Sequence, residues 1–321
     1  FALVHKQLDI SVARGIPEAA EKLEAEWDKL TSEKVAAWDL STVREKEELI
    51  RELEKDPTRE AHFGSLMELC HLKNAELSKQ HQRYKGRVVF RGDNVRDKEG
   101  YSAVFSEQGT GASHQAAAKF LDAIARLPGD DGEEADAVGA YTQAWLGGPD
   151  PMDQEKCQET WITLPAHQWP AEWHGMYRKP VVRLRKALYG HPLAGLYWEH
   201  HCRQILLEFG WEPVKGWECL YIHRQEKLFL SVYVDDFKMS GVAENLKPMW
   251  DKLKTKMDLD PPTPLSGGVY LGCGQYDIQT PIDLIREKQE HYSYVLDDGS
   301  FDSQRQCDTR APHGKSGKSR N

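Results

Sequence analysis

Hydrophobic positions along the chain follow two periods, one that predicts helices and one that predicts strands. Helical spacing recurs over 16–30, 112–127, 193–209 and 244–257. The short apolar runs that predict strands are RVVF (87–90), LYIH (220–223), LFLSVYV (228–234), FKMSG (237–241) and GVYLGC (268–273). Helices and strands mixed in this order, with a hairpin among the strands, predict an α+β fold in which helices pack on one face of an antiparallel sheet.

The two ends of the chain differ in character. Thr42 and Glu45 have the spacing of a capping box, which predicts that a charged helix opens there and runs through VREKEELIRELEKD (43–56). The final segment, APHGKSGKSRN (311–321), has almost no apolar residues to bury, so it is predicted to be disordered.

Composition favours a globular protein with a sizeable core, because 40% of the 321 residues are hydrophobic. The formal net charge of -9 argues against a uniformly basic surface for nucleic acid. Two basic strips nevertheless stand out, KQHQRYKGRVVFRGDNVR (79–96) and RKPVVRLRK (178–186). They fit a phosphate-lined groove, and they fit solvated strand edges equally well.

Nothing in the sequence predicts export or membrane insertion. No apolar run is long enough to cross a bilayer, and the first residues lack the features of a secretory signal. The six cysteines are scattered without a C-x-x-C pair, so neither a zinc ribbon nor a disulfide framework is indicated. We therefore expect an intracellular protein, cytoplasmic and compatible with the nucleus, without membrane contact. The oligomeric state stays open.

Two neighbouring acids, Asp235 and Asp236, interrupt the most apolar part of the chain, LFLSVYVDDFKM (228–239). If the flanking runs form a hairpin, the pair lies at its turn. Like charges about 4 Å apart cost on the order of 4 kcal/mol at an effective dielectric constant near 20. A divalent cation such as Mg²⁺ would remove this repulsion and would suit phosphoryl-transfer chemistry. An ordinary polar turn explains the bare pair as well.

The surroundings of this pair resemble a known enzyme family. YVDD (233–236), between apolar strands, resembles the palm signature of reverse transcriptases. The blocks that resemble copia-type retrotransposon enzymes, in the order of that family, are YKGRVVFRG (84–92), ADAVGAYTQAWL (135–146), KALYGHPLAGLYW (186–198) and YLGCGQYDI (270–278). The resemblance covers about residues 24–278.

The resemblance implies a right-hand polymerase fold with fingers and palm. Residues 1–78 would form an N-terminal helical segment leading into the fingers, and 79–278 would form the fingers and the palm. Residues 279–321 would be a truncated or degraded thumb and tail. The implied partners are an RNA template, a DNA or RNA primer and deoxynucleoside triphosphates.

The resemblance also implies the catalytic group. Asp136 would join Asp235 and Asp236, and the three carboxylates, with the backbone carbonyl of Ala137, would hold two Mg²⁺ ions or, alternatively, Mn²⁺. One ion would activate the primer 3'-hydroxyl, and the other would neutralise the triphosphate and the pyrophosphate leaving group.

Further residues acquire expected roles through the resemblance. Tyr141 would lie under the sugar of the incoming nucleotide and exclude a 2'-hydroxyl. The other residues expected to contact substrates are Lys85 and Arg87 at the triphosphate, Tyr189 and Gly190 beside the nucleotide, Leu271 and Gly272 at the primer end, and, more weakly, Arg183, Arg185 and Lys186 at the template.

Departures from the family pattern leave alternatives open. HPLAG (191–195) replaces L-K-Q-A-P, so a basic residue and a glutamine of the family are missing, and Gly139 stands where a polar residue is frequent. The hypotheses are an RNA-directed DNA polymerase and a catalytically decayed or domesticated copy that binds nucleic acid. A third, an RNA replicase, is disfavoured by Tyr141 and by Val234, where such enzymes usually have Gly.

Overall fold

The computed structural model describes residues 5–105, 115–147, 158–270 and 273–274 of the chain. These residues belong to one compact unit. The C-terminal segment predicted over 279–321 lies outside the described residues.

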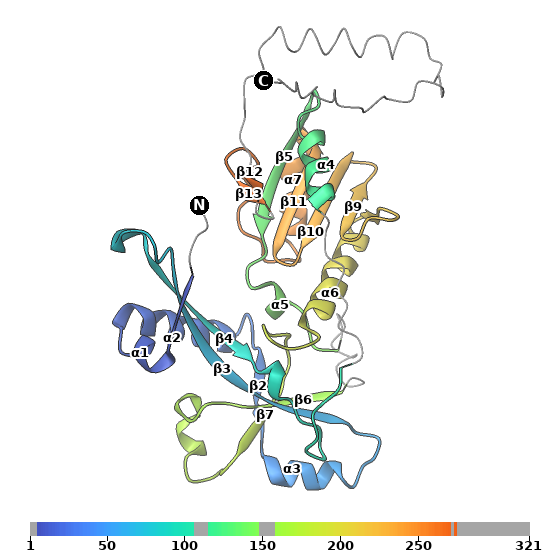
Figure 1. Ribbon diagram of the computed structural model, residues 1–321. Helices are drawn as coiled ribbons and strands as arrows, with labels where there is room; N and C mark the ends of the chain where they lie inside the picture. Colours follow the sequence, from blue (N-terminus) through green and yellow to red (C-terminus); the bar gives the residue numbers. More distant parts are fainter. Residues whose placement is uncertain (1–4, 106–114, 148–157, 271–272, 275–321) are drawn as a thin grey trace, which may run out of the picture. The chain divides into compact units, whose positions relative to one another are not determined.

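The described residues form a mixed α and β fold (Figure 1). The helices are α1 (Ile10–Arg14), α2 (Pro17–Thr31), α3 (Lys46–Leu53), α4 (Gln115–Ile124), α5 (Ala140–Gln143), α6 (Ala194–Glu208) and α7 (Ala243–Leu253). The strands are β1 (Lys6–Leu8), β2 (Trp38–Glu45), β3 (Ala61–Lys73), β4 (Arg83–Phe90), β5 (Asp130–Asp136), β6 (Glu159–Thr163), β7 (Pro180–Leu184), β8 (Glu212–Pro213), β9 (Leu220–His223), β10 (Leu228–Tyr233), β11 (Asp236–Val242), β12 (Thr263–Pro264), β13 (Val269–Tyr270) and β14 (Cys273–Gly274). None of the helices in this part of the chain is both long and apolar enough to cross a membrane.

One sheet combines the N-terminal strands with strands from the middle of the chain. Its order is β1-β3-β6-β7-β2, and β4 pairs with β3 beside this path. The long strand β3 serves two partners, because residues 61–65 run parallel to β6 and residues 66–73 run antiparallel to β4. The segment 1–78, expected to be helical, therefore supplies three strands as well as helices.

The predicted capping box is wrong. Thr42 and Glu45 both lie in β2, and α3 begins only at Lys46. The Thr42 hydroxyl donates to the carbonyl oxygen of Asp39 at 2.6 Å and accepts a hydrogen bond from the main-chain N–H of Arg183 at 2.9 Å. The Thr42 side chain therefore bonds within β2 and to β7, more than a hundred residues away in sequence, and does not cap a helix.

A second sheet is antiparallel throughout, in the order β12-β5-β11-β10-β9-β8. The predicted hairpin is present as β10 and β11, with Tyr233 paired to Asp236, so that two residues form the turn. On the other side of β11, strand β5 pairs with it over seven positions, from Asp136 opposite Asp236 to Asp130 opposite Val242.

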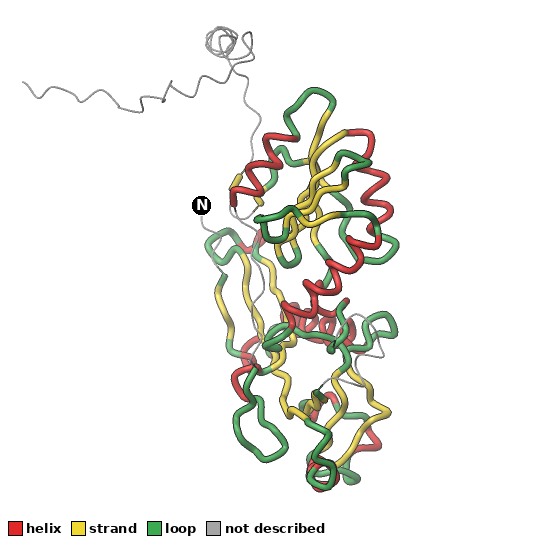
Figure 2. The backbone as a smooth tube through the Cα atoms, turned by 90° about the vertical axis from the view of Figure 1, so that its right-hand side faces the viewer, coloured by secondary structure: helices red, strands yellow, loops and turns green. Residues whose placement is uncertain are grey.

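Helices cover both faces of this second sheet, rather than the one face that the sequence pattern predicts (Figure 2). Leu230 and Met239, which are paired in register, pack on one face in a core that includes buried residues of α6 and α7. Phe229 points to the opposite face and packs with Leu121 of α4. The reason is that β10 carries apolar side chains at consecutive positions, so both of its faces need cover.

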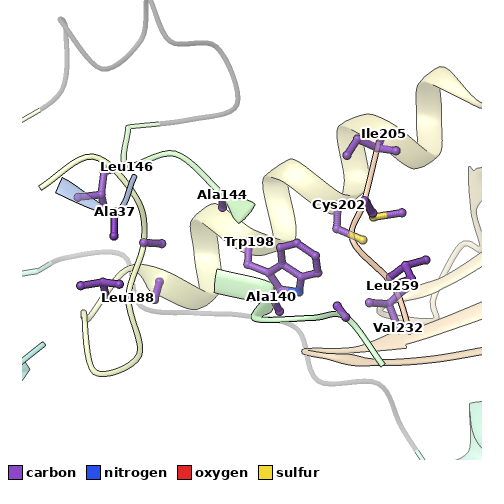
Figure 3. Packing of buried hydrophobic residues seen from close by; sticks show 14 of the residues in the cluster. Ala37, Ala140, Ala144, Leu146, Leu188, Trp198, Cys202, Ile205, Val232 and Leu259 are labelled. Carbon is purple, nitrogen blue, oxygen red and sulfur yellow. The ribbon is translucent and has the colours of Figure 1, made fainter. Parts of the chain in front are cut away.

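The largest hydrophobic cluster connects α6 to this sheet. Trp198, Cys202 and Ile205 are spaced at helical intervals along one side of α6 and are buried with Val232 of β10 (Figure 3). Because α6 begins just after the loop at 189–190 and ends next to the sheet, its packing fixes that loop relative to the β10–β11 turn.

The 189–190 loop also docks directly on the end of β4. The main-chain N–H of Phe90 donates to the carbonyl oxygen of Tyr189 at 2.8 Å. Gly190 has a left-handed backbone, with φ +86°, and a Cβ at this position would lie 2.1 Å from the carbonyl oxygen of Phe90. Only glycine satisfies both the backbone conformation and the close approach.

We expect Gly190→Ala to reduce the free energy of unfolding by about 3–5 kcal/mol, because the added methyl group must displace the β4 backbone. Gly175→Ala is the matched control: Gly175 has φ +87°, but a Cβ there meets no atom within 4 Å. The control should therefore lose only about 1 kcal/mol, the cost of the left-handed conformation alone. Chemical denaturation measures both values, and equal losses would show that the contact with Phe90 contributes nothing.

Candidate active site

The pairing of β5 with β11 brings two distant acids together. Asp136 is the last residue of β5 and lies directly opposite Asp236, the first residue of β11. Directly opposed residues in an antiparallel pair project to the same face of the sheet. The residue after Asp136 also bonds to the hairpin turn, because the main-chain N–H of Ala137 donates to the carbonyl oxygen of Asp235 at 2.7 Å. The backbone positions of the three acids named from the sequence are thus brought to the same end of β5 and β11.

The turn that carries Asp235 has a strained backbone. Val234 has φ +53°, a left-handed conformation that is costly for a β-branched residue. The indole Nε1–H of Trp198 donates to the carbonyl oxygen of Val234 at 2.6 Å and ties the turn to α6. Sequence reasoning gave Trp198 no role, although the residue lies in a block that it had singled out.

Burial and neighbouring negative charges raise the pKa values of Asp136 and Asp236. Burial raises the pKa of Asp236 to about 6, and the charges of Asp235, Asp136 and Glu134 add to the shift. Burial also raises the pKa of Asp136, with further contributions from Asp235 and Asp260. The charge contributions to these shifts come mainly from other carboxylates, so a cation bound here would stabilise the ionised acids.

The donor chemistry of this group fits Mg²⁺, which takes hard oxygen ligands and retains several waters. Asp136 is solvent-exposed, and Asp235 and Asp236 are partly exposed, so hydrated ions can reach them. Within the described residues, no set of three His, Cys, Asp or Glu side chains is already gathered as a metal-binding cluster. The fit thus lies in ligand type, register and charge, and binding would have to draw the carboxylates together.

Two cations of β4 project towards the acids. Gly86, between them, faces α2 so closely that a Cβ would lie 2.6 Å from the carbonyl oxygen of Lys22. Lys85 and Arg87 therefore share the opposite face of the strand. Burial and the charge of Arg87 lower the pKa of Lys85, whereas Asp235 acts in the opposite sense, which shows that this lysine lies within electrostatic reach of the turn.

Aromatic rings connect these cations to the acids. The rings of Tyr141 and Tyr189 meet edge to face, with centroids 4.6 Å apart, and the guanidinium of Arg87 lies 4.7 Å from the centroid of the Tyr189 ring. Burial raises the pKa of Tyr189 to about 12, and burial followed by the charge of Asp235 raises the pKa of Tyr141. Both phenols are therefore neutral near pH 7.

A short helix positions Tyr141. Gly139, the N-cap residue just before α5, has φ +63°, a left-handed conformation that favours glycine. This explains why a glycine replaces the polar residue that is frequent in the family at this position. The Gln143 amide donates to the carbonyl oxygens of Val138 at 3.2 Å and Asp258 at 3.0 Å. These bonds fasten both ends of α5 and thereby fix Tyr141 next to the strand that carries Asp136.

Other residues named from the sequence lie elsewhere. Leu271 and Gly272 fall outside the described residues. Arg183 forms an ion pair with Glu159 at 3.1 Å, and Arg185 forms one with Asp39 at 2.7 Å, so both charges are engaged. Lys186 is buried, which is unsuited to a contact with a template strand on the surface.

Sequence reasoning missed a buried charge beside the acids. Lys238, two residues after Asp236 on β11, is fully buried, forms an ion pair with Asp122 of α4 and lies 5.0 Å from the centroid of the Tyr270 ring. Glu134 is paired opposite it on β5. The sequence offered one sign of this buried charge, which is the lysine inside the apolar run FKMSG. Such a lysine is unusual because lysines are rarely buried, and this strand is covered on both faces.

Comparison with known proteins gives a consistent result. Residues 167–309 match the model of the family described as "Reverse transcriptase (RNA-dependent DNA polymerase)". The match includes Tyr189, Gly190, Asp235 and Asp236 and extends past the last motif noted in the sequence, whereas Asp136 precedes it.

Curated relatives come from Saccharomyces cerevisiae. The Ty1-GR1 and Ty1-BL transposon Gag-Pol polyproteins are each 31% identical over 103 residues, and the Ty1-MR1 Gag-Pol polyprotein is 33% identical over 103 residues. Each alignment covers 32% of this chain and 5% of the relative, so the chain spans a small part of the polyproteins that it matches. The family match and these relatives together support a reverse transcriptase domain of the copia-type retrotransposon family in this chain.

Proposed function

We propose that this chain is an RNA-directed DNA polymerase domain, which extends a primer on an RNA template with deoxynucleoside triphosphates. The observation that supports the proposal most directly is the register of β5 and β11, which sets Asp136 opposite Asp236 beside the turn that carries Asp235. An ordinary polar turn has no need of a third acid from a strand about a hundred residues earlier.

The carboxylates of Asp136, Asp235 and Asp236, with the carbonyl oxygen of Ala137, would hold two Mg²⁺ ions. When bound, such ions lower the pKa of the primer 3'-hydroxyl and neutralise the charge of the leaving pyrophosphate. The protein itself would contribute positioning, since the hydrogen bond from Trp198 to the carbonyl oxygen of Val234 holds the backbone of the turn that carries Asp235 before substrate arrives.

The residues around the acids suit a nucleoside triphosphate. Lys85 and Arg87 would bind its phosphate oxygens through charge-assisted hydrogen bonds. Tyr141 would lie against the sugar, where its ring, held by Tyr189, leaves no room for a 2'-hydroxyl. Gly190 would let the backbone approach the nucleotide closely.

One feature favours the second candidate, a decayed copy that binds nucleic acid without catalysis. His191 stands in HPLAG, in place of the family's L-K-Q-A-P, and burial lowers its pKa to about 3. Its ring is tilted against that of Phe90, with centroids 4.9 Å apart. In register with that block His191 stands at the leucine, whereas Pro192 and Leu193 stand at the lysine and the glutamine, so the donors that those two residues would offer to template and nucleotide are missing.

We expect Asp235→Asn to lower primer extension on an RNA template at least about 100-fold, since removing even the partners of metal ligands costs roughly 10–100-fold. Asp131→Asn, at the far end of the same sheet region and exposed, is the matched control and should keep full activity. Incorporation of labelled deoxynucleotide with Mg²⁺ measures both. Equal extension by the two variants, or none by the unmodified chain, would leave the decayed copy as the better description.

Tyr141→Val should raise the ratio of ribonucleotide to deoxynucleotide incorporation by about 10–100-fold, because relieving one steric clash is typically worth 1–3 kcal/mol. Tyr101→Val is the control, since Tyr101 is 73% exposed and distant in sequence from the motif. Single-nucleotide extension with each substrate gives the ratio. An unchanged ratio in Tyr141→Val would place the sugar-selecting residue elsewhere.

The raised pKa of Asp236 predicts a pH effect on stability without Mg²⁺. Above pH 6 the carboxylate is ionised in both states, and its burial destabilises the folded protein. As the pH falls towards 4, the folded state takes up the proton first and gains about 1–2 kcal/mol, a value discounted for partial exposure. Asp236→Asn should remove this gain, while Asp131→Asn should keep it. Denaturation curves between pH 4 and 8 test the difference, and parallel profiles for the two variants would contradict it.

A further inference from the structure

A pocket of about 480 Å³, separate from the acidic site, is lined by an unusual number of lysines. We call it the lysine pocket. The lysines come from three parts of the chain: the end of α2 and the turn after it, the segment after β7, and the segment after α7. They are Lys29, Lys34, Lys186, Lys254 and Lys256, and Asp258 is the acid that lines the pocket with them.

The carboxylates near the pocket neutralise only part of this charge. Asp258 forms an ion pair with Lys34, and Glu208, outside the lining, pairs with Lys256 at 2.5 Å. Within the part of the chain that the structure describes, Lys29 and Lys254 form no ion pair. Lysines are normally kept apart by repulsion or matched by acids, so this excess indicates an anionic ligand.

The deepest lysine adds an independent observation. Lys186 is only 8% exposed; its ammonium donates to the carbonyl oxygen of Gln143 at 3.2 Å and faces the ring of Trp145 at 3.6 Å. Burial lowers its pKa to about 8, and no ion pair of Lys186 is present among the residues that the structure describes. A buried ammonium satisfied by one neutral oxygen and a ring is costly, and an anion in the pocket would remove that cost.

We propose that the lysine pocket binds a compact oligophosphate, such as pyrophosphate or the triphosphate of a nucleotide. The pocket volume suits a ligand of that size. Its charge comes from lysines, which bind phosphate as point charges without the planar geometry that selects carboxylates. A terminal phosphate can reach a lysine as deep as Lys186, whereas the phosphates of a nucleic acid backbone are flanked by sugars and stay at the surface.

The ligand would touch the segment that positions the active site. Val138, Thr142 and Gln143 line the lysine pocket, and the same segment carries Asp136 at one end and Tyr141 in its helix. Lys29 extends to this segment as well, since a Cβ at Gly139 would lie 2.9 Å from its Nζ. Bound oligophosphate would therefore order the connection between the first acid and the sugar-contacting tyrosine.

The test is a binding measurement that does not depend on polymerase activity. Inorganic triphosphate is titrated calorimetrically into the full chain carrying Lys85→Gln and Arg87→Gln, in buffer freed of divalent ions by a chelating resin. These substitutions remove the phosphate-binding residues of the proposed polymerase site, so failure of the polymerase proposal leaves the result interpretable. In this background Lys29→Gln with Lys254→Gln should weaken binding at least about 10-fold.

The matched control in the same background is Lys119→Gln with Lys215→Gln, two exposed lysines that do not line the pocket, which removes the same net charge. It should change the affinity less than about 2-fold. Thermal unfolding verifies that both variants are folded. Equal affinities for the two pairs, or no binding by the background protein, would overturn the proposal. Displacement of triphosphate by a duplex without terminal phosphates, with the same dependence on Lys29 and Lys254, would assign the pocket to a nucleic acid backbone and overturn it too.

Discussion

The antiparallel register between β5 and β11 is the constraint on which the rest of the site depends. Ala135 and Phe237, paired in that register, are buried in the core, and this burial sets Asp136 and Asp236 on the other face. A slip by one residue would exchange the two faces and bury the acids instead. The free energy of hydrophobic packing therefore offsets the repulsion between the two carboxylates, which do not attract each other.

The cost of that approach is concentrated at one tip of the sheet. Asp236 holds its proton more tightly than an ordinary carboxyl, and Val234 adopts a conformation that β-branched residues avoid. Both are unfavourable for folding alone, and rigid neighbours maintain them: the Trp198 indole on one side and the paired strands on the other. Local rules of folding are commonly violated at functional sites, where the violation serves binding or chemistry.

Periodicity alone predicted much of the fold, including the helix over 16–30, the helix over 193–209 and the β10–β11 hairpin, because these patterns are local. The predictions are wrong where contacts with residues distant in sequence determine the structure. Thr42 was predicted to cap a helix, but its hydroxyl accepts a hydrogen bond from the main-chain N–H of Arg183 in another strand. One covered sheet face was predicted, but α4 also covers the second face, where it packs against Phe229. Asp235 and Asp236 stand out as a charged pair inside an apolar run, and the family resemblance adds Asp136, whereas the lysine pocket joins three separate segments that no single motif contains.

The separation of charge within one acidic chain connects these features. The acids lie at the end of β5, the lysines of the lysine pocket lie beside α5, and Val138 to Gln143 is the short segment between the two. Such an arrangement shows why the net charge of -9 says little about phosphate ligands. Charges more than a Debye length apart, about 8 Å at physiological salt, are largely screened from each other. A phosphate group therefore responds to the few lysines around it, and a metal ion responds to the few carboxylates, so an acidic protein can offer sites to both.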